Sequence, residues 1–82
     1  MRVSVYSIQN TLFEGEAEKL IARTPEGQMT VLDDHLPIVA VLNGPLIRVV
    51  DKDGKERHLD IVSGILEVRP QSDVVVIANV AE

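Results

Sequence analysis

The sequence predicts an all-β domain, a small flattened barrel or sandwich of about eight to ten short, mainly antiparallel strands. Apolar and polar residues alternate over several short stretches, which is the period of a strand with one buried face. Turn residues recur every 8 to 12 residues or so, the spacing typical of sandwiches and small barrels. Residues 74–78 form a largely β-branched run. With 82 residues in all, we expect residues 1–82 to form a single domain.

The strongest local signal is Asp53-Gly54, which lies between two apolar stretches, residues 46–50 and 59–62. Asp and Gly tolerate the backbone angles that tight turns require, so this pattern predicts a β-hairpin. Charged side chains keep its tip in water, namely Lys52, Lys55 and Glu56.

The chain after this hairpin predicts two more strands. Residues 59–62 and 65–69 alternate in polarity, and Gly64 is expected to mark a bend between them. Residues 70–73, Pro-Gln-Ser-Asp, supply a turn. Residues 74–78 are apolar on both faces, which predicts a central strand.

The first half of the chain is less uniform. Val3 and Val5 alternate with polar neighbours, and the turn-forming residues 43–45 separate a strand at 38–41 from the first arm of the hairpin. Residues 16–23 are rich in helix formers, but this stretch is shorter than an isolated helix requires. We therefore expect a strand there as well.

Composition excludes several classes of function. The net charge of −5 repels phosphate backbones, and one Tyr with one Phe leaves few rings for base stacking, so no nucleic-acid partner is expected. Without cysteine there are no disulfides, thiolate nucleophiles or cysteine-ligated metals. No apolar run reaches the ~18 to 20 residues that span a bilayer, and the first residues lack the apolar core of a signal peptide. We expect a soluble chain with no direct membrane insertion.

The candidate chemical groups are weak. His35 follows Asp33 and Asp34, but adjacent residues of an extended chain point to opposite faces, which disfavours a metal site or a catalytic dyad. Residues 49–60 fit a calcium loop poorly, because Val49 stands at the first ligand position and Asp60 at the twelfth, where a glutamate is expected. Lys52 and Lys55 near the hairpin tip allow an alternative, a carrier domain with a modified lysine, although their neighbours differ from the usual recognition triplets. We expect no catalysis, no metal and no cofactor.

Two connections, residues 24–28 and 32–37, combine Pro with polar side chains, and the first also contains Gly27. Loops on a rigid sandwich commonly carry binding determinants. From the residues alone, the chain is a protein-binding module without a named partner.

Five stretches in register resemble the epsilon subunit of F-type ATP synthases, specifically its N-terminal β-sandwich. They are residues 12–18 (LFEGEAE), 26–32 (EGQMTVL), 35–37 (HLP), 44–49 (GPLIRV) and 63–68 (SGILEV). Together they extend over most of the chain. Asp33-Asp34 replace the Pro-Gly usual before the histidine, and Ser63-Gly64 carries one glycine where the family has two.

The resemblance implies a non-catalytic rotor subunit of the central stalk, which binds the gamma subunit and rests on the ring of c subunits. By residue-to-residue matching, Glu26, Gly27 and Gln28 form the c-ring-facing loop, and His35 and Leu36 face gamma. The implied role is to couple proton or sodium flow to ATP synthesis. The implied location is peripheral, on the cytoplasmic face of the bacterial plasma membrane.

In the family, a helical hairpin that follows the sandwich inhibits ATP hydrolysis and in some members responds to ATP. The sequence stops at Glu82, where these helices would begin, so we expect neither inhibition by insertion nor the usual response to ATP. Two alternatives remain open beside the rotor subunit: the carrier domain with a modified lysine, and a free-standing protein-binding adaptor.

Overall fold

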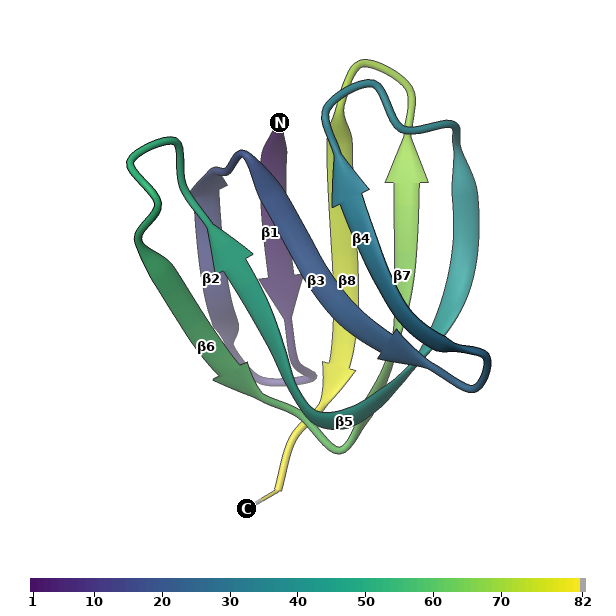
Figure 1. The fold of residues 1–82 in the computed structure, drawn as a ribbon. Helices are drawn as coiled ribbons and strands as arrows, with labels where there is room; N and C mark the ends of the chain where they lie inside the picture. Colours follow the sequence, from purple (N-terminus) through teal and green to yellow (C-terminus); the bar gives the residue numbers. More distant parts are fainter. Residues whose placement is uncertain (82) are drawn as a thin grey trace.

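The structure is a computed structural model and describes residues 1–81, which form eight β-strands (Figure 1). Their bounds are β1 Arg2–Tyr6, β2 Thr11–Glu16, β3 Lys19–Thr24, β4 Gly27–Leu32, β5 Ile38–Val50, β6 Glu56–Asp60, β7 Ser63–Arg69 and β8 Asp73–Asn79. The described residues contain no helix that is long and apolar enough to cross a membrane.

The strands are connected in the order β2-β1-β8-β7-β5-β3-β4, with β6 paired to β5. This continuous sheet folds over into two layers (Figure 1). The first layer holds β2, β1, β8, β7 and the first half of β5, and the second holds β6, β3, β4 and the second half of β5. The pairing of β1 with β8 is parallel and the other six pairings are antiparallel. The predicted all-β sandwich is confirmed.

Strand β5 belongs to both layers. Its first part, from Ile38 to Asn43, pairs with β7, and its last part, from Leu46 to Val50, pairs with β6. The prediction that residues 43–45 separate two strands is wrong. They lie within one strand, because backbone hydrogen bonds continue through them: the Gly44 nitrogen donates to the Val62 oxygen at 3.0 Å. The change of pairing partner at this point turns the strand from one layer into the other.

The other predicted elements agree with the structure except at one glycine. Asp53-Gly54 lies in the turn of the β5–β6 hairpin, and β8 is a central strand between β1 and β7. Residues 16–23, which are rich in helix formers, hold the end of β2 and most of β3, as expected. The bend expected at Gly64 lies at Val62 instead. Gly64 is inside β7, where a Cβ atom would stand 2.9 Å from the Ile77 oxygen of β8.

The core between the two layers is aliphatic. Leu20 and Ile47 from the second layer and Leu66 and Val76 from the first are completely buried. Ala22 and Ala78 are also buried in this core. The two layers therefore share one close-packed core, and the turns project from it.

Candidate partner-binding surfaces

The loop predicted to face the c-ring is the tip of the β3–β4 hairpin. Glu26, Gly27 and Gln28 are all exposed. The Thr24 hydroxyl donates to the Gly27 oxygen at 2.9 Å and accepts from the Glu26 nitrogen at 3.1 Å, so a single side chain fixes the turn. Gly27 has a φ of 123°, a region that favours glycine. The tip is therefore well defined, with its side chains directed outward.

A groove lies between this tip and the start of β5. Its walls are residues 24–29 on one side and 38–41 on the other. Met29 and Ile38 are partly buried and pack against the core, whereas Val39 is largely exposed. The groove is therefore apolar toward the core and polar toward the hairpin tip.

The second predicted region, His35 and Leu36, lies in the docking loop, by which we mean residues 33–37 between β4 and β5. The His35 nitrogen donates to the Leu32 oxygen at 3.2 Å. The imidazole Nδ1 lies 2.7 Å from the Leu36 oxygen, which accepts a hydrogen bond when Nδ1 carries the proton. Leu36 itself is 77% exposed. The loop thus presents an apolar side chain to solvent.

The aspartates before His35 do not act with it. Asp33 forms an ion pair of 2.7 Å with the N-terminal amine of Met1, and the backbone nitrogen of Asp34 donates to the Ser72 hydroxyl at 3.2 Å. In the part of the chain that the structure describes, no three His, Asp or Glu side chains are grouped to hold a metal ion.

The two predicted regions lie at opposite ends of β4 (Figure 1). The strand from Gly27 to Leu32 separates them, a length of roughly 17 Å at the rise of an extended chain. They therefore do not form one site.

A third surface lies on the outer side of the first layer. Val41 of β5 is paired with Ile65 of β7, Ile65 with Ile77 of β8, and Ile77 with Tyr6 of β1. Directly paired residues point to the same face of a sheet. We call these four residues the apolar row. Val41, Ile65 and Ile77 are 57%, 53% and 52% exposed, and Val39, at 71%, lies on the same face two residues from Val41.

This row was not predicted as a site, although a signal for it was present. Residues 74–78 are apolar on both faces, a pattern that predicts a central strand, and residues 38–42 are apolar as well. The structure covers only one side. Which apolar residues are left outside depends on the pairing of distant strands, and the period of the sequence alone does not reveal it.

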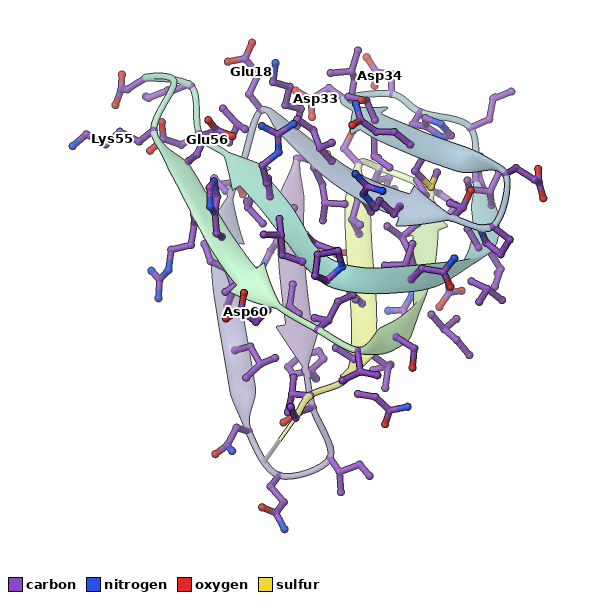
Figure 2. The ribbon with its side chains drawn as sticks, turned by 60° about the horizontal axis from the view of Figure 1, so that its bottom comes forward. Glu18, Asp33, Asp34, Lys55, Glu56 and Asp60 are labelled. Atoms are coloured by element: carbon purple, nitrogen blue, oxygen red, sulfur yellow. The ribbon has the colours of Figure 1, made fainter. Side chains whose placement is uncertain are left out.

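The end of the molecule near the docking loop is acidic. Glu18, Asp33 and Asp34 project there (Figure 2). The Met1 amine is buried beside them, with Asp33 at 2.7 Å and Glu16 at 3.6 Å. The hydrogen bond that the amine donates to Asp33 raises the pKa of the amine above its ordinary value, and burial opposes this effect. The negative charges of Asp33 and Glu16 raise the pKa of the amine further.

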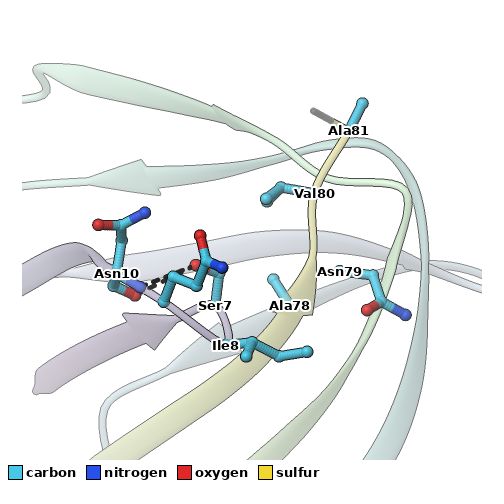
Figure 3. Close-up of a pocket in the computed structure, with 8 residues that line it drawn as sticks. Ser7, Ile8, Asn10, Ala78, Asn79, Val80 and Ala81 are labelled. Carbon is cyan, nitrogen blue, oxygen red and sulfur yellow. Dashed lines mark hydrogen bonds between the residues drawn. The ribbon is translucent and has the colours of Figure 1, made fainter.

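The opposite end carries a hollow between the β1–β2 turn and the segment after β8 (Figure 3). The Ser7 hydroxyl accepts from the Asn10 nitrogen at 3.1 Å and so closes the turn. Ile8 at its tip is 91% exposed. This end therefore exposes a further apolar side chain.

Comparison with known proteins gives these surfaces a context. A family model described as ATP synthase, Delta/Epsilon chain, beta-sandwich domain matches residues 1–82. The ATP synthase epsilon chain of Shouchella clausii is 35% identical over 82 residues, and that of Psychrobacter cryohalolentis is 36% identical over 81 residues. These matches include 100% and 99% of this chain, but 60% and 58% of the relatives. The chain thus spans about three fifths of the length of these relatives.

Solved structures share the fold. A chain of the Euglena gracilis mitochondrial ATP synthase, in a structure of OSCP, F1 and c-ring, superimposes with a TM-score of 0.84 at 24% identity, over 93% of this chain and 48% of that one. A chain of the Tetrahymena thermophila mitochondrial ATP synthase central stalk and c-ring gives 0.76 at 12% identity, over 95% and 62%. Because the family model extends over the whole sequence, this chain belongs to the delta/epsilon β-sandwich family of ATP synthase subunits.

Proposed function

We propose that the chain is a non-catalytic rotor subunit of the central stalk of an F-type ATP synthase. In this role it binds the gamma subunit, contacts the c-ring through Glu26, Gly27 and Gln28, and couples proton or sodium flow to ATP synthesis. Its proposed place is peripheral, at the cytoplasmic face of the bacterial plasma membrane. The observation that carries the proposal is the apolar row on the outer face of the first layer.

The apolar row favours a stable protein partner. Its members lie on four neighbouring strands, so they form a continuous patch that one surface can cover. Burial of apolar surface contributes about 25 cal/mol per Å², and contiguous exposed apolar patches commonly mark protein interfaces. We assign this face and the nearby Leu36 to gamma.

The connections between strands support a mechanical role. The c-ring-facing tip belongs to β3 and β4, β3 is paired with the second half of β5, and the first half of β5 carries Val41 of the apolar row. A force on the tip is therefore passed to the gamma-facing surface through paired backbone and a close-packed core. Such interiors have low compressibility and transmit strain.

Co-purification with the gamma subunit of the same organism tests the proposal. We expect wild-type chain to retain gamma and an Ile65→Lys variant to lose it, because a lysine in the middle of the row places an unpaired charge in the interface. Thr30→Lys is the matched control, since Thr30 is also exposed on a strand but lies in the second layer. Absence of gamma binding by the wild-type chain would contradict the proposal, and equal loss in both variants would remove the apolar row from it.

A further inference from the structure

The N-terminal amine of Met1 is held at the start of the first layer. It donates to the Ala17 oxygen at 2.9 Å, and the Ala17 nitrogen donates back to the Met1 oxygen at 2.8 Å. Met1 is buried, and the two charged neighbours of its amine are Asp33 and Glu16. An ammonium group has three N–H donors, one for each of its three neighbouring acceptors, which are the Ala17 oxygen, Asp33 and Glu16.

Of the two carboxylates, Asp33 makes the closer contact. Its Oδ1 lies 2.7 Å from the amine, within the range of a charge-assisted hydrogen bond, whereas Glu16 lies 3.6 Å away on a side chain that is 76% exposed. Asp33 is the first residue of the docking loop. The amine therefore binds the loop at the point where it leaves β4.

A second contact holds the next residue. The backbone nitrogen of Asp34 donates to the side-chain hydroxyl of Ser72 at 3.2 Å. The backbone carbonyl oxygen of Ser72 accepts in turn from the backbone nitrogen of Arg2 at 2.9 Å. Ser72 lies in the β7–β8 turn, and Arg2 begins β1. Both ties thus connect the docking loop to the layer that carries the apolar row.

We propose that Asp33 is a positioning residue for gamma binding: through its ion pair with the Met1 amine it fixes the docking loop relative to the apolar row, so that both present one continuous surface. The proposal has a structural half and a docking half. The docking half, that the fixed loop favours gamma binding, rests on the proposed function. The structural half, the immobilisation of residues 33–37 by the ion pair, stands independently of any partner.

Amide hydrogen exchange of the isolated chain tests the structural half. Asp33→Asn keeps the shape of the side chain but removes its charge. We expect the amide hydrogens of residues 33–36 to exchange about tenfold faster, because one charge-assisted hydrogen bond is lost. Exchange in β8 serves as the internal reference for global stability. Asp33→Glu, which restores the charge, is expected to recover most of the protection, and Glu16→Gln to change little.

A second preparation leaves Asp33 intact. The 82-residue chain is short enough for chemical synthesis with an acetylated N-terminus, which removes the charge of the amine and leaves a single N–H donor. We expect it to reproduce the faster exchange of Asp33→Asn. Unchanged exchange in both preparations would overturn the proposed immobilisation.

Affinity for gamma tests the docking half. We expect Asp33→Asn and the acetylated chain to bind gamma about tenfold more weakly and Asp33→Glu to bind almost as the wild type does. Faster loop exchange with unchanged affinity would overturn the positioning role. If the wild-type chain itself fails to bind gamma, the proposed function is wrong, while the exchange measurements still decide whether the ion pair holds the loop.

Discussion

The nitrogen of Gly44 donates to the oxygen of Val62 at 3.0 Å, at the point where β5 passes from one layer to the other. The Ile61 nitrogen donates to the Pro45 oxygen at 2.9 Å, so the segment after β6 lies directly against this part of β5. A Cβ atom added to Gly44 would collide with the Ile61 oxygen. The crossing of the strand between layers thus requires a residue without a side chain.

Gly44→Ala is therefore expected to lower the free energy of unfolding by about 2 kcal/mol or more, because backbone must move to admit the methyl group. Gly15→Ala is the matched control. Its Cβ would lie 3.6 Å from the Phe13 ring, an ordinary contact, and we expect a change of less than about 1 kcal/mol. Urea unfolding of the three proteins gives the comparison, and equal stability of the two variants would contradict the close approach described here.

The strands and the β5–β6 hairpin were predictable because their signals are local. Alternation of polarity and an Asp-Gly turn act within a few residues. The continuity of β5 through Gly44 was not predictable, because it depends on hydrogen bonds to Ile61 and Val62, which come from another part of the chain. Gly64 shows the same effect, since its neighbour across the sheet is Ala78.

The candidate surfaces were predictable to different degrees. Loops with Pro and Gly were visible in the sequence, and family resemblance directed attention to Glu26 and His35. The apolar row was missed, because Tyr6 and Val41 are 35 positions apart in the numbering and become part of one patch only through β7 and β8. The ion pair of Met1 with Asp33 was likewise hidden in the sequence, since it joins the start of the chain to a distant turn.

Two neighbouring residues of β7 should differ sharply in their effect on stability. Leu66 is completely buried, and Leu66→Ala is expected to cost about 2 to 5 kcal/mol because it leaves a cavity in the core. Ile65 points to the outer face, and Ile65→Ala is expected to cost less than about 1 kcal/mol. Urea unfolding measures both. A large loss for Ile65→Ala in the isolated chain would show that the apolar row is covered by the chain itself.

The Met1 amine makes the free energy of unfolding decrease at alkaline pH. The pKa of the amine is raised in the folded chain, mainly by the hydrogen bond to Asp33. The charged amine therefore contributes fully to the free energy of unfolding below its pKa in the unfolded chain, which is about 8. This contribution is lost as pH rises through the folded pKa. We expect the free energy of unfolding to fall more between pH 7 and about 10 in the wild type than in Asp33→Asn, which lacks the main cause of the shift.

The comparison with Asp33→Asn isolates the amine from other titrating groups. Asp33 faces the amine from the docking loop and Glu16 from β2. A hollow beside the amine is also bordered by Glu18, Asp51, Lys52 and Asp53. Urea unfolding at several pH values supplies the data. Parallel curves for the two proteins would contradict the assigned role of the amine.

The tip of the β3–β4 hairpin can be altered without disturbing the fold, provided that Gly27 is kept. Gly27 has a φ of 123°, so a side chain there would strain the backbone. Glu26 and Gln28 are exposed. We therefore expect the free energy of unfolding of the double variant Glu26→Trp, Gln28→Trp to lie within about 1 kcal/mol of the wild-type value. If the tip rests on the c-ring, the two bulky rings should reduce ion-driven ATP synthesis in membrane vesicles that carry the assembled enzyme. Lys55→Trp, at the tip of the β5–β6 hairpin, controls for a bulky exposed ring, and equal rates in all three preparations would exclude the β3–β4 tip from the coupling contact.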